Sequence, residues 1–420
     1  MVKTALKMLL IERRKVKNLF ISITATLCVC TVFMQFFCNP HLQKVTLSID
    51  FYIFSEDFLI SLLGFFVLVI CISMIVYSCN YYMKIHSREI GLIKLAGFNN
   101  FQIVLYQVIQ LSVIIFFSTL LCIILSVIFI PLSLYSIYNY CGIKESIFFY
   151  NFELVQLMLS VIFAIFIIIL ALQMGYINRN LITSLMQPYQ TTAYNENKLF
   201  DIPDYIYILG YLLGLYTMYV GDEFSAGFAI SSCIGAISAY GLFYYWVPHV
   251  IEEALEDLDI NATNCIVLGD LALFMKQSKI LIVLIMLSVI LLPTFIFSSR
   301  DMKLLHIALH IASILINILL SMSIINRFNI DNLEKVKHFS NLRKIGLTKK
   351  EVRIISIKEG NCFYFILWIF TSIYIVSIFT TFCFRTTLNF KLGAVVLLEF
   401  ICPYILSQII VNVNKRRNFK

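Results

Sequence analysis

The sequence predicts an all-α, polytopic membrane protein. Hydrophobic residues account for 60% of its 420 residues, and charged residues for only 13%. The mean hydropathy is +0.89. Soluble domains carry about 25% charged residues, because a folded surface must meet water. A soluble fold could not hide this apolar excess, so lipid must cover much of the chain.

The apolar runs set the expected number of helices, because one span needs about 20 mainly apolar residues. The fifth run is the shortest. The third exceeds the thickness of a bilayer, so we expect its first turns to extend into the cytoplasm and Pro131 to bend or end its far end. We expect ten spans, at residues 18–38, 58–82, 103–138, 152–176, 205–220, 224–247, 280–297, 304–325, 362–384 and 392–413.

The placement of basic residues predicts the orientation of these spans. With residues 1–17 in the cytoplasm, the inner segments contain 26 Lys and Arg residues and the outer segments 6. Basic residues are retained on the cytoplasmic side of membranes. This asymmetry predicts an even number of spans with both termini in the cytoplasm. The wealth of Ile, Asn, Lys and Phe suggests a bacterial genome, and hence the plasma membrane of a bacterium.

A short pattern occurs twice, offset by 249 residues. Ile-Lys-Leu-Ala-Gly-Phe at 93–98 recurs as Leu-Arg-Lys-Ile-Gly-Leu at 342–347, and each copy leads into a long apolar run. Such a repeat predicts duplicated halves in a 4+2+4 arrangement of spans. We therefore divide the chain into a cytoplasmic amphipathic segment (1–17), a first four-helix unit (18–190), a linking helix pair (191–250) and a second four-helix unit (251–420).

The repeat resembles a known signature. Residues 84–98 (KIHSREIGLIKLAGF) are similar to the pattern R-x-x-E-I-G-x-L-K-A-x-G of FtsX/MacB-like ABC transporter permeases, and residues 341–352 (NLRKIGLTKKEV) resemble a second copy. The span plan is similar to that of the bacitracin-resistance permeases. It lacks their large extracellular domain, since only residues 298–303 separate spans seven and eight. The second copy also lacks the acidic position, having His-Phe-Ser at 338–340 in place of Glu-Ile-Gly.

By this resemblance, each copy couples the permease to an ATPase. A short charged helix beneath the bilayer can dock on an ATPase, and a glycine permits a tight turn into the next helix. Each copy alone could be an ordinary basic loop, but the glycine in register in both favours coupling. The predicted coupling residues are Arg88, Glu89, Gly91, Lys94 and Gly97, then Arg343, Lys344, Gly346 and Glu351, with Gln110 and Glu359 aligned near the start of the next helices.

The chain is not expected to be an enzyme. No G-x-x-x-x-G-K-[ST] phosphate-binding loop occurs in the sequence, so ATP and Mg would bind to a separate ABC ATPase subunit, present by resemblance in two copies. The other expected partners are membrane lipid and an amphipathic peptide or lipid-linked molecule. Nucleic acid is not expected, because the basic residues lie in short loops between apolar runs.

Few ionisable residues fall within the predicted spans. Glu399 lies about two turns into the last span, and we predict an intramembrane polar site there, bonded to substrate or to a neighbour such as Asn317 or Gln408. His306 and His310 are one helical turn apart, a spacing that would suit a metal. The sequence offers no third ligand nearby, so we predict no metal site.

The leading hypothesis is a permease subunit that exports or removes an antimicrobial peptide, a bacteriocin or a similar amphipathic molecule, for resistance or self-immunity. One alternative is an ion-driven secondary transporter, which would need ionisable groups in broken helices at mid-membrane. Another is a non-transporting, FtsX-like signalling subunit.

Overall fold

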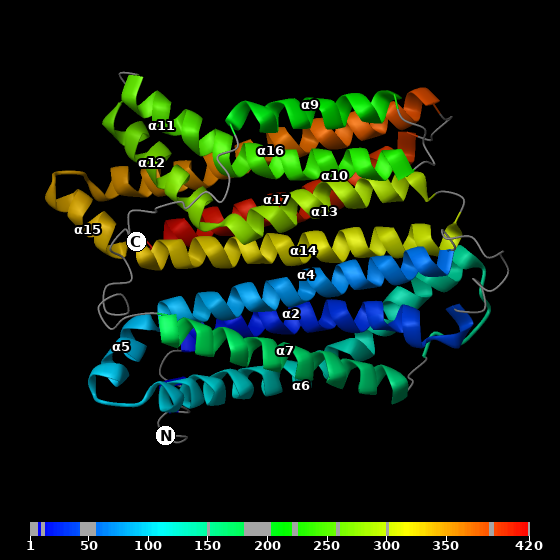
Figure 1. Cartoon of the computed structure of the whole chain (residues 1–420), viewed down its shortest axis with the longest axis horizontal. Helices are drawn as coiled ribbons and strands as arrows, with labels where there is room; N and C mark the ends of the chain where they lie inside the picture. Colours follow the sequence, from blue (N-terminus) through cyan, green and yellow to red (C-terminus); the bar gives the residue numbers. More distant parts are fainter. Residues whose placement is uncertain are drawn as a thin grey trace. The chain divides into compact units, whose positions relative to one another are not determined.

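The computed structural model describes residues 7–9, 13–42, 56–148, 152–179, 203–220, 226–257, 261–299, 302–385 and 390–418. Every regular element in these ranges is a helix (Figure 1). The chain divides into two compact units, Met1–Glu196 with Met302–Ala308, and Asn197–Asp301 with Leu309–Lys420. Most of the expected N-terminal segment and the expected boundary at residue 190 lie outside the described residues.

The helices fit an all-α polytopic membrane protein. Within the described ranges, eight are long and apolar enough to cross a membrane. Two other expected spans form shorter helices, α9 (Asp204–Val220) with 17 residues and α10 (Ala226–Gly241) with 16, so the total of ten stays a prediction. The eight are α2 (Arg13–Cys38), α4 (Glu56–Ile85), α6 (Asn100–Cys141), α7 (Phe152–Arg179), α13 (Lys279–Ser298), α14 (Lys303–Glu334), α16 (Lys349–Arg385) and α17 (Phe390–Asn418).

The first unit is built around α2. The apolar part of α2 is 83% buried, whereas that of α7 is 17% buried, so α2 is central and α7 peripheral. Helix α2 packs against α4, α6 and α7. Polar side chains join it to its neighbours: the Asn39 amide donates to the Tyr138 hydroxyl at 2.9 Å, and Ser133 donates to Gln35 at 3.2 Å. Between apolar helices, van der Waals contacts do not by themselves specify one arrangement, and interhelical hydrogen bonds of this kind fix the helices in place.

Two helices are longer than the apolar runs that predicted them. Helix α6 has 42 residues and continues through Pro131 to Cys141, so this proline does not end it. At about 1.5 Å per residue it is about 63 Å long, twice the hydrocarbon thickness of about 30 Å. Helix α16 begins at Lys349, well before the expected start at residue 362. The polar residues before the apolar run of α16 therefore belong to the same rod.

The second unit is built around α13, whose apolar part is 72% buried and which packs against α10 and α16. A π-helical turn (Leu242–Trp246) continues α10 into α11 (Val247–Asp257), which packs against α12 (Ala262–Gln277). Aromatic rings join the last helices: Phe328 stacks on Phe274 at 4.3 Å, and Phe363 meets both edge-on. These rings form the apolar surroundings of the charged groups described below.

Candidate functional site: two elbows

A short helix follows α4 in the first unit and α14 in the second. These are α5 (Ser87–Leu95) and α15 (Val336–Lys344), and each is followed by a turn into the long helix α6 or α16 (Figure 1). We call residues 87–99 the first elbow and residues 336–348 the second elbow. The 249-residue offset of the sequence repeat aligns the first elbow with the second.

Both elbows turn at a glycine in the left-handed region. Gly97 has φ of 88° and Gly346 has φ of 115°, as the sequence pattern predicted for a tight turn. The amide of Gly97 donates to the Lys94 carbonyl at 3.1 Å, and that of Phe98 to the Ile93 carbonyl at 3.5 Å. This pair of bonds defines a Schellman motif.

The second elbow repeats these bonds residue for residue. The Gly346 amide donates to the Arg343 carbonyl at 3.2 Å, and the Leu347 amide to the Leu342 carbonyl at 3.2 Å. A side chain in this left-handed conformation would cost about 1–2 kcal/mol. Both turns therefore require glycine.

The helix after each elbow also starts in the same way. The Asn99 amide donates to the Gln102 side chain at 3.1 Å, and the Thr348 amide donates to the Glu351 carboxylate at 2.7 Å. These are capping boxes, in which the third helical residue satisfies the amide that precedes the helix. Gln102 and Glu351, aligned by the repeat, thus have one structural role.

A small apolar core holds each elbow against the next helix. In the first, Ile90 packs with Ile103. In the second, Phe339 packs with Leu342 and Val352. Phe339 and Val352 follow Ile90 and Ile103 by 249 residues, so the repeat extends to the packing.

The polar contacts behind the first elbow join tyrosine, glutamine and histidine side chains. Tyr82 donates its hydroxyl to the Gln110 side-chain oxygen at 3.4 Å, and Gln110 donates to the Tyr106 hydroxyl at 3.1 Å. The ring of His86 lies 2.9 Å, by its Nδ1, from the Tyr82 carbonyl oxygen. All four side chains are buried.

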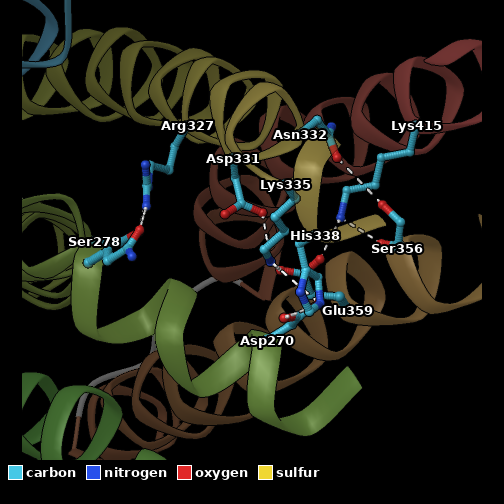
Figure 2. A network of polar contacts seen from close by, with 11 residues as sticks. Asp270, Ser278, Arg327, Asp331, Asn332, Lys335, His338, Ser356, Glu359 and Lys415 are labelled. Atoms are coloured by element: carbon cyan, nitrogen blue, oxygen red, sulfur yellow. Dashed lines mark hydrogen bonds and ion pairs between the residues drawn. The ribbon is translucent and has the colours of Figure 1, made fainter. Parts of the chain in front are cut away.

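At three equivalent positions the second unit carries charges: Asp331, Lys335 and Glu359 replace Tyr82, His86 and Gln110. Figure 2 shows Lys335 reaching between the two carboxylates. Its Nζ lies 2.9 Å from Asp331 and 2.5 Å from Glu359. The charges thus lie where the second elbow joins its two long helices.

Lys415 approaches the other oxygen of Glu359 from α17. Its Nζ lies 3.4 Å from Glu359 Oε2 and donates to the Ser356 carbonyl at 2.6 Å. It also lies 4.5 Å from the centroid of the Phe328 ring. Lys415 is fully buried. Buried charges must be paired, and this lysine has both a carboxylate and an aromatic face.

Helix α12 adds a third carboxylate. Asp270 lies 3.9 Å from Lys335 and 3.6 Å from the ring of His338 on the second elbow. We call the set Asp270, Asp331, Lys335, His338, Glu359 and Lys415 the ionic network. It joins α12, α14, α15, α16 and α17 within the second unit (Figure 2).

Burial and charge act in opposite directions on these groups. Burial raises the pKa of Asp270 and of Asp331, and the nearby Lys335 opposes that rise only in part. Burial alone would lower the pKa of Lys335, but the three surrounding carboxylates outweigh burial and raise it. Lys335 therefore stays charged, and it is the cation around which the carboxylates gather.

No family model matches the chain, and no curated protein is significantly similar to it. Its function is therefore inferred from the chemistry of the elbows.

The other predicted coupling residues lie on the surface or brace the elbows. Arg88 is exposed, Glu89 is half-buried and Gly91 is buried on α5. Lys94 donates to the Ile177 carbonyl of α7 at 3.4 Å. Arg343 and Lys344 are both exposed in the last turn of α15.

Glu399 lies apart from the elbow contacts and has a partner that the sequence did not predict. Its Oε1 lies 2.6 Å from Nδ1 of His310 on α14, and its side chain is 7% exposed. The expected neighbours bond elsewhere: Asn317 donates to Ser313 and Gln408 donates to Asn361. The pairing expected with Asn317 or Gln408 is therefore wrong, because positions along one helix do not show which face of another helix they meet.

Sequence reasoning missed most of the ionic network. Asp270 lies in α12, between two predicted spans, and Lys335 and Lys415 belong to the basic residues that predict the orientation of the spans. One signal was available. The offset of 249 that aligns Gln110 with Glu359 also aligns His86 with Lys335, so a charged pair could have been sought there.

Proposed function

We propose that this chain is the permease subunit of an ABC transporter, which couples ATP hydrolysis by a separate ATPase subunit to the export or removal of an amphipathic peptide. The recurrence of one elbow in both units carries the proposal. Each elbow has the same short helix, the same Schellman turn at glycine and the same capping box into a long helix.

The elbows are suited to transmit a mechanical displacement. A Schellman turn followed by a capping box leaves few free dihedral angles between the short helix and the long one. Helix α6 has 42 residues and α16 has 37, so each is a rod whose end moves with its elbow. A push on an elbow would tilt the long helix that follows it, and we propose that this tilt moves the substrate.

The substrate class rests on the resemblance and on the short connection between α13 and α14. Helix α13 ends at Ser298 and α14 begins at Lys303, so four residues separate them. We propose that the substrate binds within the bilayer, against the apolar helices, which suits an antimicrobial peptide or a bacteriocin. Protection of the cell would be the outcome.

The ion-driven alternative has less support. The His310–Glu399 pair lies within membrane-length helices, and α14 and α17 continue unbroken past these residues. Ion-coupled carriers bind their ions where helices are interrupted. A single bonded pair in two continuous helices fits a packing contact better.

The test uses two surface changes at equivalent positions, Leu95→Glu and Lys344→Glu. Both side chains are exposed, so folding should be retained while docking is disturbed. We expect a wild-type amount of protein in the membrane, loss of the co-purifying ABC ATPase and loss of resistance to a panel of cationic and lipid-binding peptides. Glu253→Lys, an exposed charge reversal on α11, is the matched control and should leave all three unchanged.

Two results would refute the proposal. If no ABC ATPase accompanies the wild-type chain from native membranes, the permease assignment fails. If deletion of the gene leaves sensitivity to every peptide of the panel unchanged, the peptide substrate is wrong.

A further inference from the structure

The outer faces of the two elbows differ although their backbones agree. In the first, three exposed side chains near the turn are large and apolar, beside the exposed Arg88: Leu92 is 52% exposed, Leu95 58% and Phe98 41%. Phe101, in the first turn of α6, is 63% exposed. Four large apolar side chains within ten residues thus face outward.

The equivalent residues in the second unit are mostly polar. Asn341, Lys344 and Lys350 replace Leu92, Leu95 and Phe101, and all three are exposed. Only Phe98 keeps an apolar counterpart, Leu347, which is half-buried. The two elbows therefore differ in the charge that they expose, although their backbone geometry is the same.

The second elbow and the first turn of α16 carry three basic residues, Lys344, Lys349 and Lys350, at positions where the first unit has none. Arg343 keeps the basic character of its counterpart, Lys94. All four cations of the second unit are exposed, and none of them makes an ion pair among the described residues. Glu351 lies next to them, but its carboxylate accepts bonds from Thr348 in the capping box. Four unneutralised cations within eight residues favour an acidic partner.

An apolar side chain lies among these cations. Ile345 is 81% exposed, between Lys344 and the turn at Gly346. An exposed isoleucine at the tip of a basic surface suits a groove with an apolar floor and acidic walls. The same groove would also accept the apolar face of the first elbow, so two copies of one partner subunit could serve both.

We infer that the second elbow and the first turn of α16 dock, through Arg343, Lys344, Lys349 and Lys350, into an acidic-walled groove of the ABC ATPase, whereas the first elbow docks mainly through the apolar side chains Leu92, Leu95 and Phe98. This inference rests on the proposed function. Because both elbows share one backbone geometry, we expect both to bind the same kind of partner. Under the proposed function this partner is the ATPase protein and not lipid. Attachment at the second elbow is therefore more sensitive to salt than attachment at the first.

The experiment exchanges residues between the elbows. The full chain is placed in neutral phosphatidylcholine nanodiscs, and its dissociation constant for the co-purifying ABC ATPase is measured at low and high KCl. Exposed ion pairs are screened over about 10 Å at 0.1 M salt, so the wild-type constant should rise about tenfold across this range. K344L/K350F should weaken this rise, and L95K/F101K should strengthen it.

The outcomes separate the two claims. If the ATPase binds but the exchange variants keep the wild-type salt dependence, the docking inference is overturned and the permease assignment stands. If salt dependence is seen only in anionic phosphatidylglycerol nanodiscs, the cations bind lipid, and the inference is again overturned. If the ATPase does not bind the wild-type chain at all, both claims fail.

Discussion

Lys415 is the residue on which the ionic network can be tested most simply. It is fully buried three residues before the end of α17, and its ammonium group contacts Glu359 and the Ser356 carbonyl. Its neighbour Arg416 is exposed. Two adjacent basic residues on one helix therefore differ in burial and in partners.

We predict that Lys415→Met destabilises the protein and that Arg416→Met does not. Removing one partner of a buried ion pair costs about 3–5 kcal/mol, because the other charge remains in an apolar environment. Here Glu359 keeps Lys335, so we expect about 3 kcal/mol. Exposed changes are usually within about 0.5 kcal/mol. Thermal unfolding in detergent should show a lower Tm only for Lys415→Met, and equal Tm values would mean that Lys415 is not held as described.

At this scale the sequence identified Glu359 but not its partners. The repeat aligned Glu359 with Gln110, which marked the position without showing its environment. The ionic partners Lys335 and Lys415 could not be recognised from the sequence, because the positive-inside rule accounts equally well for any lysine near the end of a span. Their partners lie on other helices, and sequence spacing along one helix does not predict such contacts.

Among the elements, the two Schellman turns are where helix geometry depends on a single residue. Nothing lies within 4 Å of a Cβ built on Gly97 or Gly346, so substitution there would be opposed by the backbone alone. The same is true of the space around Gly175 and Gly269, but these two lie inside α7 and α12 with ordinary helical φ. The second pair provides a matched control for the first.

We predict that Gly97→Ala and Gly346→Ala each cost about 1–2 kcal/mol, because alanine must adopt the left-handed conformation. Asparagine tolerates that conformation, so Gly97→Asn and Gly346→Asn should cost less. In the controls Gly175→Ala and Gly269→Ala, alanine is the better helix former by about 1 kcal/mol, so stability should be unchanged or higher. The Tm of each variant distinguishes these cases. If Gly175→Ala and Gly269→Ala lowered the Tm as much as Gly97→Ala and Gly346→Ala, the two turns would not depend on glycine's left-handed conformation.

The turns could be predicted from the sequence because a Schellman motif has a local signature. Glycine after a basic last turn ends a helix in both copies, and the capping residues follow at fixed spacing. The start of α16 could not be found in the same way. Residues 349–361 contain six charged residues, so hydropathy predicts that the span starts at residue 362, whereas the helix begins at Lys349, directly after the capping residue Thr348.

For the whole molecule, composition predicted the class but not the arrangement. An apolar fraction of 60% predicts lipid contact, and the described helices fit that class. The division into four, two and four spans depends on α9 and α10. Helix α9 has 17 residues, at the lower limit of about 17 for crossing a bilayer, and α10 has 16 before its π-helical continuation at Leu242. Adding or removing one span would exchange inside and outside for everything that follows.

The central claim is that both elbows lie on the cytoplasmic side, where the ATPase subunits can reach them. Single cysteines at the equivalent, exposed positions Leu95→Cys and Lys344→Cys test it, in a chain whose 12 native cysteines are replaced. A membrane-impermeant maleimide should label both in inside-out vesicles and neither in intact cells. Labelling of one elbow from outside the cell and the other from inside would contradict the account.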